Sequence, residues 1–257
     1  MDSAPEGVDP NVPNVARMYD YYLDGKDNFA ADREAAERIM KIFPVTKDAA
    51  RENRAFLRRA VREVVAGGVR QIIDLGAGLP TQGNTHEIAP EARVVYVDYD
   101  PVVCTHGRAL LARGEKVDFL QADARKPDEL LERLDGMVDF GQPVAFMMLA
   151  ILHFIPDDDA YGIVGKLRDV SVPGSHLVIS HAIDAKPDTT PQAIEVYNQA
   201  TAGLNLRTHE EIVRFFDGYE LLEPGLVFPK DWRPDGGETY GGGTAIGYAG
   251  VGRKTGP

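Results

Sequence analysis

Two adjacent stretches decide the fold: Arg70–His86, RQIIDLGAGLPTQGNTH, and Ala92–Pro101, ARVVYVDYDP. The first is a short apolar run that enters a glycine turn, and the second is an apolar run that ends in acids. A strand, a glycine turn and a second strand closed by a carboxylate are typical of a site for an adenosine-containing cofactor in α/β proteins. Several chemistries share this pattern, so the surrounding residues have to identify the cofactor.

Apolar runs and helical segments alternate along the rest of the chain. Near-continuous apolar strands interleaved with helices predict a parallel sheet covered on both faces, with right-handed crossovers. Two later strands without a helix between them predict an antiparallel pair at the sheet edge. We therefore expect a doubly wound, mostly parallel α/β sheet of seven strands, Rossmann-like, with strands within residues 70–75, 92–98, 116–123, 143–151, 175–183, 219–228 and 243–254.

The segment before these strands has a helical period. Residues 15–67 contain three stretches with apolar residues at helical spacing, interrupted by Pro44 and closed by Gly67 and Gly68. We expect a helical cap over residues 15–67 and a Rossmann-like core over 68–257, which together form a single domain over 15–257. Residues 1–14 carry prolines and acids, so we expect a flexible N-terminus there.

The charge of the chain argues against nucleic acid as a partner. The 28 Lys and Arg and 40 Asp and Glu give a net charge of −12, which opposes binding to a phosphate backbone. The basic cluster in Arg51–Glu63 has an apolar face at helical spacing, so its arginines are expected on a solvated face. No apolar run approaches the roughly 20 residues of a membrane helix and no secretory signal is seen, so we expect a cytoplasmic protein.

The glycine turn argues against NAD. A dinucleotide site uses G-x-G-x-x-G, and the third glycine is missing after Gly78, where Pro80 lacks the N–H that a pyrophosphate cradle uses. Acids instead end three consecutive strands, at Asp74, Asp98 and Asp123. The carboxyl ends of parallel strands meet at one edge of the sheet, where a carboxylate can accept hydrogen bonds from both ribose hydroxyls.

These motifs resemble those of the class I S-adenosylmethionine-dependent methyltransferases. The similarity lies in IIDLGAGLP, VVYVDYDP, LQADARKP, and AFMMLAILHFIPD followed by VPGSHLVISH. The segments NVARMYDYYLDGKDNFAADREAAE, NRAFLRRAV and DLGAGLPTQGNTHE also resemble a bacterial S-adenosyl methyltransferase family whose acceptor is generally unassigned. The resemblance spans nearly the whole chain, and it implies a Rossmann-like methyltransferase fold with S-adenosylmethionine as the cofactor.

The resemblance implies a contact for each part of the cofactor. Three residues of the glycine turn would lie against the methionine part, which the acid of the first strand orients. The acid of the second strand would hold the ribose. The acid of the third strand and the residue after it would meet the adenine amino group, and two residues would flank the ring. The methionine contacts are Gly76, Ala77, Gly78 and Asp74, and the ribose acid is Asp98. The adenine contacts are Asp123 and Ala124, with Tyr99 and Asp100 flanking the ring.

In the resembling family the helical cap folds over the cofactor. Tyr19, Lys26 or Asn28 could therefore contact the methionine end or the acceptor. The alternative is that Tyr19, Tyr22 and Phe29 are packing anchors of an N-terminal helix pair. We include Tyr19 in the predicted cofactor site and leave both interpretations open.

His153 is the candidate catalytic residue. It follows the fourth strand at the carboxyl end of the sheet, where the transferable methyl should point, and a base is needed only if the acceptor must lose a proton. The alternative is a structural role in the loop before Pro156, and His181 likewise is either catalytic or structural. His86 could lie beside the cofactor or simply begin a helix. We predict no metal site, because the acids in Pro156–Ala160 open a helix, where carboxylates stabilise the positive end of the dipole.

Together these observations predict a methyltransferase that acts on a small-molecule acceptor enclosed by the cap and the edge strands. One alternative is a non-catalytic S-adenosylmethionine-binding protein that serves regulation. Another is an NAD-linked oxidoreductase, which the missing third glycine disfavours. The acceptor, its attacking atom and the oligomeric state are left open.

Overall fold

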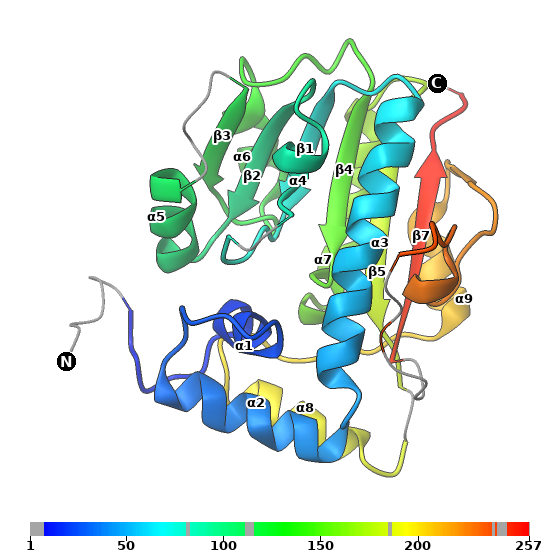
Figure 1. The fold of residues 1–257 in the computed structure, drawn as a ribbon. Coiled ribbons are helices and arrows are strands. Elements are labelled where there is room, and N and C mark those ends of the chain that lie inside the picture. The colour runs from blue at the N-terminus through cyan, green and yellow to red at the C-terminus, as the bar shows by residue number, and fades with distance from the viewer. Residues whose placement is uncertain are drawn as a thin grey trace.

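The structure is a computed structural model that describes residues 8–80, 83–110, 116–184, 187–237, 240 and 246–256. Its described part is built on a seven-stranded sheet in the order β3-β2-β1-β4-β5-β7-β6 (Figure 1). Strands β1 to β5 are parallel, and β7 pairs antiparallel with both β5 and β6. The predicted fold is confirmed. The strands are β1 Gln71–Leu75, β2 Arg93–Asp98, β3 Val117–Gln121, β4 Val144–Leu149, β5 His176–Ala182, β6 Glu220–Leu221 and β7 Gly247–Arg253.

The edge strand β6 is shorter than the predicted range of 219–228. Pro224 lacks the N–H that a continued ladder would use, and pairing with β7 resumes only at a bridge between Val227 and Ala249. Residues 243–245 of the predicted last strand lie outside the described residues. The antiparallel pair itself is as predicted, because β6 and β7 pair in that direction.

Helices cover both faces of the sheet because neighbouring strand residues point to opposite sides. Ile73 and Val95 pack in one core with α6 and α7, whereas Ile72 and Val94 pack in another with α3 and α5. Among the described helices, none is long and apolar enough to cross a membrane. The helices are α1 Val15–Tyr22, α2 Ala30–Ile42, α3 Thr46–Ala66, α4 Thr85–Ile88, α5 Pro101–Leu110, α6 Pro127–Leu134, α7 Asp157–Val170, α8 Thr190–Asn198 and α9 His209–Val213, with 3-10 turns η1 Leu152–Phe154, η2 Arg214–Phe216 and η3 Pro229–Asp231.

Helices α1, α2 and α8 lie across the carboxyl ends of the parallel strands (Figure 1). They share a third apolar cluster, which includes Met18, Ile39 and Val196 and which the start of α3 joins through Ala50. Helix α3 then continues onto the sheet, where Phe56 is fully buried. Because α3 belongs to both layers, it fixes the cap over the strand ends. The predicted boundary at residue 67 and the single domain stay predictions.

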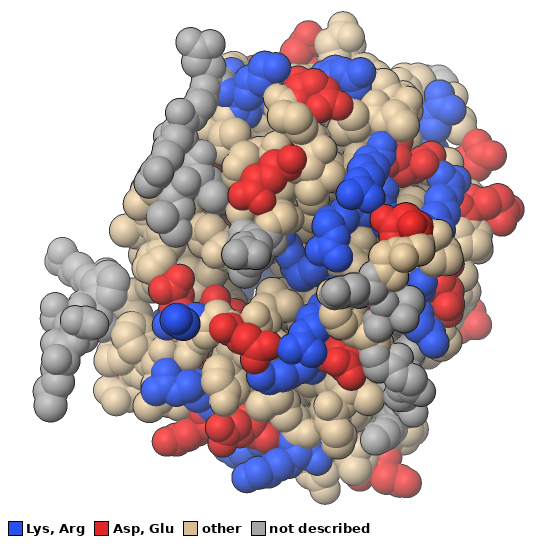
Figure 2. All heavy atoms as spheres, viewed as in Figure 1, with Lys and Arg blue, Asp and Glu red and all other residues tan. Residues whose placement is uncertain are grey.

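Two arginines of α3, Arg59 and Arg62, contact the segment that follows β6. Arg62 forms an ion pair with Asp235 at 2.9 Å, and Arg59 donates to the carbonyl of Trp232 at 2.8 Å. Basic and acidic side chains are interspersed over the face shown in Figure 2. Arg59 departs from the predicted solvated face, because only 9% of its surface is exposed.

Candidate functional site

A cavity of about 320 Å³ lies at the carboxyl ends of the parallel strands. Its walls come from α1, the start of α3, the ends of β1, β2, β4 and β5, and the loops beside β7. The structure brings together in this lining the candidate catalytic residue and all the predicted cofactor contacts except Asp100, which is absent from the described lining. Their contacts with a cofactor stay predictions. The residues are Tyr19, Asp74, Gly76, Ala77, Gly78, Asp98, Tyr99, Asp123, Ala124 and His153.

The glycine turn after β1 has a backbone that favours glycine. Gly76 has φ +69° and Gly78 has φ +66°, in the left-handed region. A Cβ on Gly76 would lie 2.5 Å from Cδ1 of Ile151, whereas a Cβ on Gly78 would meet no heavy atom within 4 Å. Gly76 is therefore required by packing within the protein, and Gly78 faces open space in the cavity wall.

Asp74 is a buried acid near the end of β1, with 7% of its surface exposed. The hydroxyl of Thr85 donates to its Oδ2 at 2.7 Å. Burial raises the pKa of Asp74 to about 6, although the hydrogen bond from Thr85 and the charge of Arg54 oppose the shift. A cation stabilises the ionised form of a buried carboxylate that has few charged partners, so Asp74 suits an ammonium group.

Asp98 ends β2 and accepts hydrogen bonds from backbone amides. The amide of Gly78 donates to Oδ2 and that of Asp100 to Oδ1, each at 3.0 Å. Burial raises the pKa of Asp98 to about 6, against the effect of these amides. The amide of Tyr99 also bonds to this carboxylate. An ionised carboxylate has about four lone-pair sites, so it can still accept from a ribose hydroxyl.

Asp123 is paired with a residue that the sequence analysis did not place in the site. Arg125 donates from Nε to Oδ1 at 2.9 Å and from Nη2 to Oδ2 at 2.7 Å, which lowers the pKa of Asp123. Its guanidinium also lies 5.5 Å from the ring centre of Tyr99. Arg125 lines the same cavity. The adenine contacts predicted for Asp123 and Tyr99 would therefore be shared with Arg125.

Arg54 of α3 also lines the cavity and was missed, because the arginines of this helix were assigned to a solvated face. Its charge opposes the rise in the pKa of Asp74 that burial causes. Its Nη2 donates to the carbonyl of Gly83 at 2.9 Å. The sequence does hold a signal: Arg54 precedes the buried Leu57 and Val61 at the i, i+3, i+7 spacing of one helix face. Arg54 provides the site with a cation near the Asp74 acid.

Tyr19 is fixed against α3 by hydrogen bonds. Its hydroxyl donates to the carbonyl of Ala50 at 3.3 Å and accepts from Nδ2 of Asn53 at 2.9 Å. Oδ1 of Asn53 is buried and has no hydrogen-bond partner within the described part of the chain. Both side chains line the cavity. Since buried polar atoms are normally paired, this oxygen is available to accept a hydrogen bond from a ligand in the cavity.

Besides Asp100, three other candidates from the sequence are absent from the described lining. Asn28 donates from Nδ2 to Asp20 at 2.8 Å, and Lys26 is exposed. Nδ1 of His86 is 2.8 Å from the hydroxyl of Tyr96. Of the polar contacts proposed for the cap, Tyr19, Lys26 and Asn28, only Tyr19 is part of the described cavity lining.

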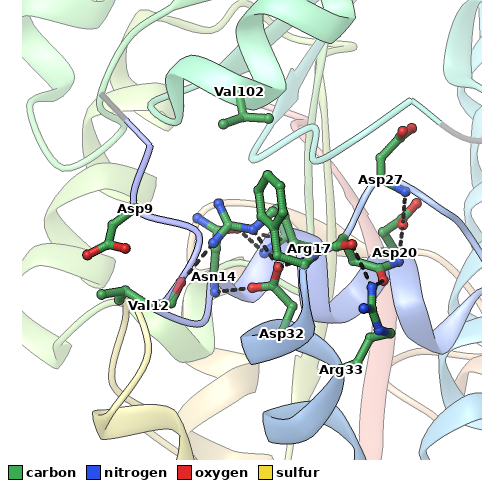
Figure 3. A network of polar contacts seen from close by, with 12 residues as sticks. Asp9, Val12, Asn14, Arg17, Asp20, Asp27, Asp32, Arg33 and Val102 are labelled. Carbon is green, nitrogen blue, oxygen red and sulfur yellow. Dashed lines mark hydrogen bonds and ion pairs between the residues drawn. The ribbon is translucent and has the colours of Figure 1, made fainter. Parts of the chain in front are cut away.

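A buried polar network fastens the start of the chain to the cap (Figure 3). Asp32 accepts from Nε of Arg17 at 2.7 Å and from the amide of Asn14 at 2.8 Å. Nδ2 of Asn14 in turn donates to the carboxylate of Asp100, whose amide binds Asp98. Asn14, which was predicted within the flexible terminus, is 3% exposed and caps α1. The network therefore connects the cap to the loop beside Asp98.

Aromatic rings form much of the remaining wall. Phe154 in the turn after β4 lies 5.5 Å from Tyr197 of α8, measured between ring centres. Phe228 stacks on Tyr248 at 5.1 Å. Tyr22 reaches the hydroxyl of Tyr197 from α1 at 3.3 Å. Flat apolar walls of this kind favour flat, largely apolar ligands.

One family model matches the chain over residues 1–255, under the description S-adenosyl methyltransferase. The chain belongs to the S-adenosyl methyltransferase family. The predicted family is therefore confirmed, and with it S-adenosylmethionine as the cofactor and a methyltransferase as the class of enzyme. Family membership also favours this cofactor over NAD.

Two solved structures of similar proteins share the fold over their full length. A candidate methyltransferase of Thermobifida fusca YX is 41% identical with a TM-score of 0.91, and the match covers 99% of this chain and 100% of that one. A duf574 family protein of Streptomyces avermitilis is 37% identical with a TM-score of 0.89, covering 96% and 99%. A candidate S-adenosylmethionine-dependent methyltransferase of Mycobacterium tuberculosis is 25% identical over 147 residues, which span 55% of this chain and 47% of that relative.

The described site fits the cofactor of the S-adenosyl methyltransferase family in charge and in shape. S-adenosylmethionine carries an ammonium, a carboxylate and a ribose diol. The cavity offers the buried acid Asp74, the cation Arg54 and the carboxylate of Asp98. At Gly78 the wall is also open, and a Cβ there would occupy cavity space that a ligand can fill. The donor set therefore matches the group that the family binds.

Proposed function

We propose that the protein transfers a methyl group from S-adenosylmethionine to a small, largely aromatic acceptor. The observation that supports this is a single cavity of about 320 Å³ lined both by the strand-end acids and by aromatic rings of the cap and the edge. Small-molecule sites span roughly 300–1,000 Å³. A space of this size suits small ligands better than a polymer chain.

In this proposal each part of the cofactor has a partner. Asp74 holds the ammonium, Arg54 the carboxylate and Asp98 the ribose diol, while Asp123 and the backbone of Ala124 meet the adenine. When bound, S-adenosylmethionine supplies a methyl group on a positively charged sulfur. The acceptor would lie against the aromatic wall that contains Phe154, Tyr197, Phe228 and Tyr248.

The chain itself contributes positioning and exclusion of water. The cap helices and the edge loops enclose the acceptor, which raises the effective concentration of its attacking atom and fixes its direction. Tyr19 and Asn53 supply polar contacts among apolar neighbours. A general base is required only for an acceptor that must lose a proton.

Replacing Asp98 with Ala should weaken binding of S-adenosylhomocysteine by about 1–3 kcal/mol, because the ribose hydroxyls lose their acceptor. Titration calorimetry measures the change. Asp118→Ala is a matched control, since Asp118 pairs with Arg93 in a half-exposed ion pair and is absent from the described cavity lining. Equal affinity of the two variants would remove Asp98 from the site.

Cofactor binding should weaken below about pH 6. In the free protein the pKa of Asp74 and that of Asp98 are each raised to about 6 from 3.8. The two protonated acids therefore stabilise the folded protein fully below about pH 4, and this stabilisation is lost as the pH rises through about 6. The ligand prefers the charged carboxylates, so its affinity should fall by up to about tenfold per pH unit for each of them below pH 6.

The melting temperature with and without S-adenosylhomocysteine, from about pH 5 to 8, tests this dependence. The increment due to the ligand should be larger at about pH 7.5 than at about pH 5. Comparing the melting temperature with and without the ligand at each pH cancels the effect of the buried histidines, which gain protons on unfolding in both cases. An increment that stays constant over this range would contradict the roles given to the two acids.

Methyl transfer itself is tested with S-adenosylmethionine labelled in the methyl carbon and a cell extract separated by size. The label should enter the low-mass fraction, and Asp98→Ala should reduce the incorporation. Label confined to macromolecules would overturn the small-molecule acceptor. Cofactor binding by calorimetry without transfer to any fraction would favour the non-catalytic regulatory protein, and binding of NAD alone would overturn the assignment of the cofactor.

A further inference from the structure

His153 is held in one orientation in the cavity wall. Its ring sits in η1, directly after β4, and only 7% of the residue is exposed. Nδ1 accepts a hydrogen bond from the amide of Ala182 in β5 at 3.2 Å. Because a backbone amide can only donate, Nδ1 carries no proton. The neutral ring therefore has its proton on Nε2, and Nε2 has no hydrogen-bond partner within the described part of the chain.

The surroundings also keep the ring neutral. Two groups face it from neighbouring elements: His181 of β5, whose ring centre is 5.4 Å away, and Arg207 from the loop before α9. Burial is the main cause that lowers the pKa of His153 well below 6.5, and the charges of His181 and Arg207 act in the same direction. A second proton on this ring would be poorly tolerated.

His181 is fixed in the opposite tautomer by the backbone of the same residue, Ala182. Its Nδ1 lies 2.6 Å from the carbonyl of Ala182, so it donates there, and its Nε2 accepts from Nη1 of Arg207 at 2.8 Å. The two rings thus bind the N–H and the C=O of Ala182. Arg207 sets the tautomer of His181 because a guanidinium can only donate.

Arg207 also holds the turn that carries His153. It donates from Nη1 to the carbonyl of Leu152 at 2.8 Å and from Nη2 to that of Ile155 at 2.9 Å, one on each side of the histidine. Arg207 is 4% exposed, and its charge is paired with Asp157 at 2.8 Å. The sequence analysis did not single out Arg207. It contacts both elements that position the ring.

We propose that His153 is a fixed N–H donor that binds a lone-pair-bearing oxygen of the acceptor, and that Arg207 is the positioning residue that holds it there. The identity of the bound molecule as the methyl acceptor rests on the proposed function, but the tautomer does not. A ring in this state has no free lone pair in the cavity, so it does not remove a proton from the attacking atom.

This role narrows the class of acceptor. The aromatic wall with Phe154 and Tyr197 favours a flat ring, and the N–H of His153 favours a carbonyl, carboxylate or phenolate oxygen on that ring. The attacking atom either carries no proton or loses it to water. An aromatic acceptor that offers only ammonium or hydrocarbon groups at this point would leave the N–H unpaired.

The tautomer is tested by nuclear magnetic resonance of the intact protein labelled with ¹⁵N in histidine and saturated with S-adenosylhomocysteine. His153→Gln identifies the signals by their loss. We expect a protonated Nε2 and an unprotonated Nδ1 that do not titrate between about pH 5.5 and 8. A proton on Nδ1, or a charged ring in this range, would overturn the proposal. Failure of S-adenosylhomocysteine to bind would instead count against the proposed function.

Two pairs of variants separate a donor from a base. His153→Gln keeps an N–H donor and should retain methyl transfer to the low-mass fraction, whereas His153→Leu should lose about 10- to 100-fold. An equal loss of methyl transfer in His153→Gln and His153→Leu would contradict the donor role and indicate that His153 acts as a base. Arg207→Met should let the His153 ring exchange between tautomers, whereas Arg214→Met, which removes another arginine beside Tyr161, should not. An unchanged ring in Arg207→Met would remove Arg207 from the proposal.

Discussion

Arg17→Met is expected to lower the free energy of unfolding by about 3–5 kcal/mol, because it leaves a buried carboxylate without its cation. The side chains of Arg17 and Asp32 are 4% and 0% exposed, and their ion pair is 2.7 Å long. The amides of Asn14 and Phe29 would still donate to Asp32, so the carboxylate would keep its geometry but not its neutralising charge. Methionine fills much of the volume of the arginine stem, so the effect reports chiefly on the charge.

Chemical denaturation of Arg17→Met and Lys126→Met measures this contrast. Lys126 pairs with Glu129 at 3.2 Å, but both side chains are exposed, at 60% and 66%. Exposed pairs contribute about 0–1 kcal/mol, so this control should lose little. A similar small loss in Arg17→Met would mean that water reaches the network of Figure 3.

The same variant should also weaken binding of S-adenosylhomocysteine. Asn14 caps α1 next to Arg17 and binds Asp100, so loosening the network releases the loop that orients Asp98. Calorimetry on the folded variant, well below its denaturation midpoint, tests this coupling. Loss of stability with unchanged affinity would show that the network supports the cap alone.

The sheet and the acids at its strand ends could be predicted because local pattern determines them. Ile72 and Ile73 belong to an apolar run, a glycine turn follows, and Asp98 ends the next apolar run. The hydrophobic pattern and the order of these segments along the chain therefore predict where the strands end and where the acids lie. The helical period of α3 was equally clear. These features depend on residues that are neighbours in the sequence.

The polar partners within the site could not be predicted in this way. Arg207 reaches His181 and the turn that carries His153 from a different part of the chain, and only the fold brings them together. Asp123 has its expected place at the end of the third strand, yet its partner Arg125 changes what the carboxylate offers to a ligand. Arg54 was missed for a different reason: a charged residue on an apolar helix face was taken as solvated because its partners were unknown.

Gly76→Ala is expected to destabilise the protein by about 2–5 kcal/mol, whereas Gly78→Ala should chiefly weaken cofactor binding. Both substitutions place an L-residue at positive φ, which costs about 1–2 kcal/mol. At Gly76 the new methyl would also lie 2.5 Å from Cδ1 and 3.0 Å from Cγ1 of Ile151, which adds about 1–3 kcal/mol of overpacking. At Gly78 the methyl would occupy open space in the cavity wall, so the protein tolerates it better than a ligand would.

Gly83→Ala separates backbone strain from contact with the cofactor. Gly83 has φ +74°, and a methyl group added there would meet no heavy atom within 4 Å, but Gly83 is absent from the described cavity lining. Denaturation should show a similar loss of stability for Gly78→Ala and Gly83→Ala. Calorimetry with S-adenosylhomocysteine should show at least a tenfold loss, about 1.4 kcal/mol, for Gly78→Ala alone. Equal affinities would place the cofactor away from Gly78, since strain is matched in the two variants and only the occupied space differs.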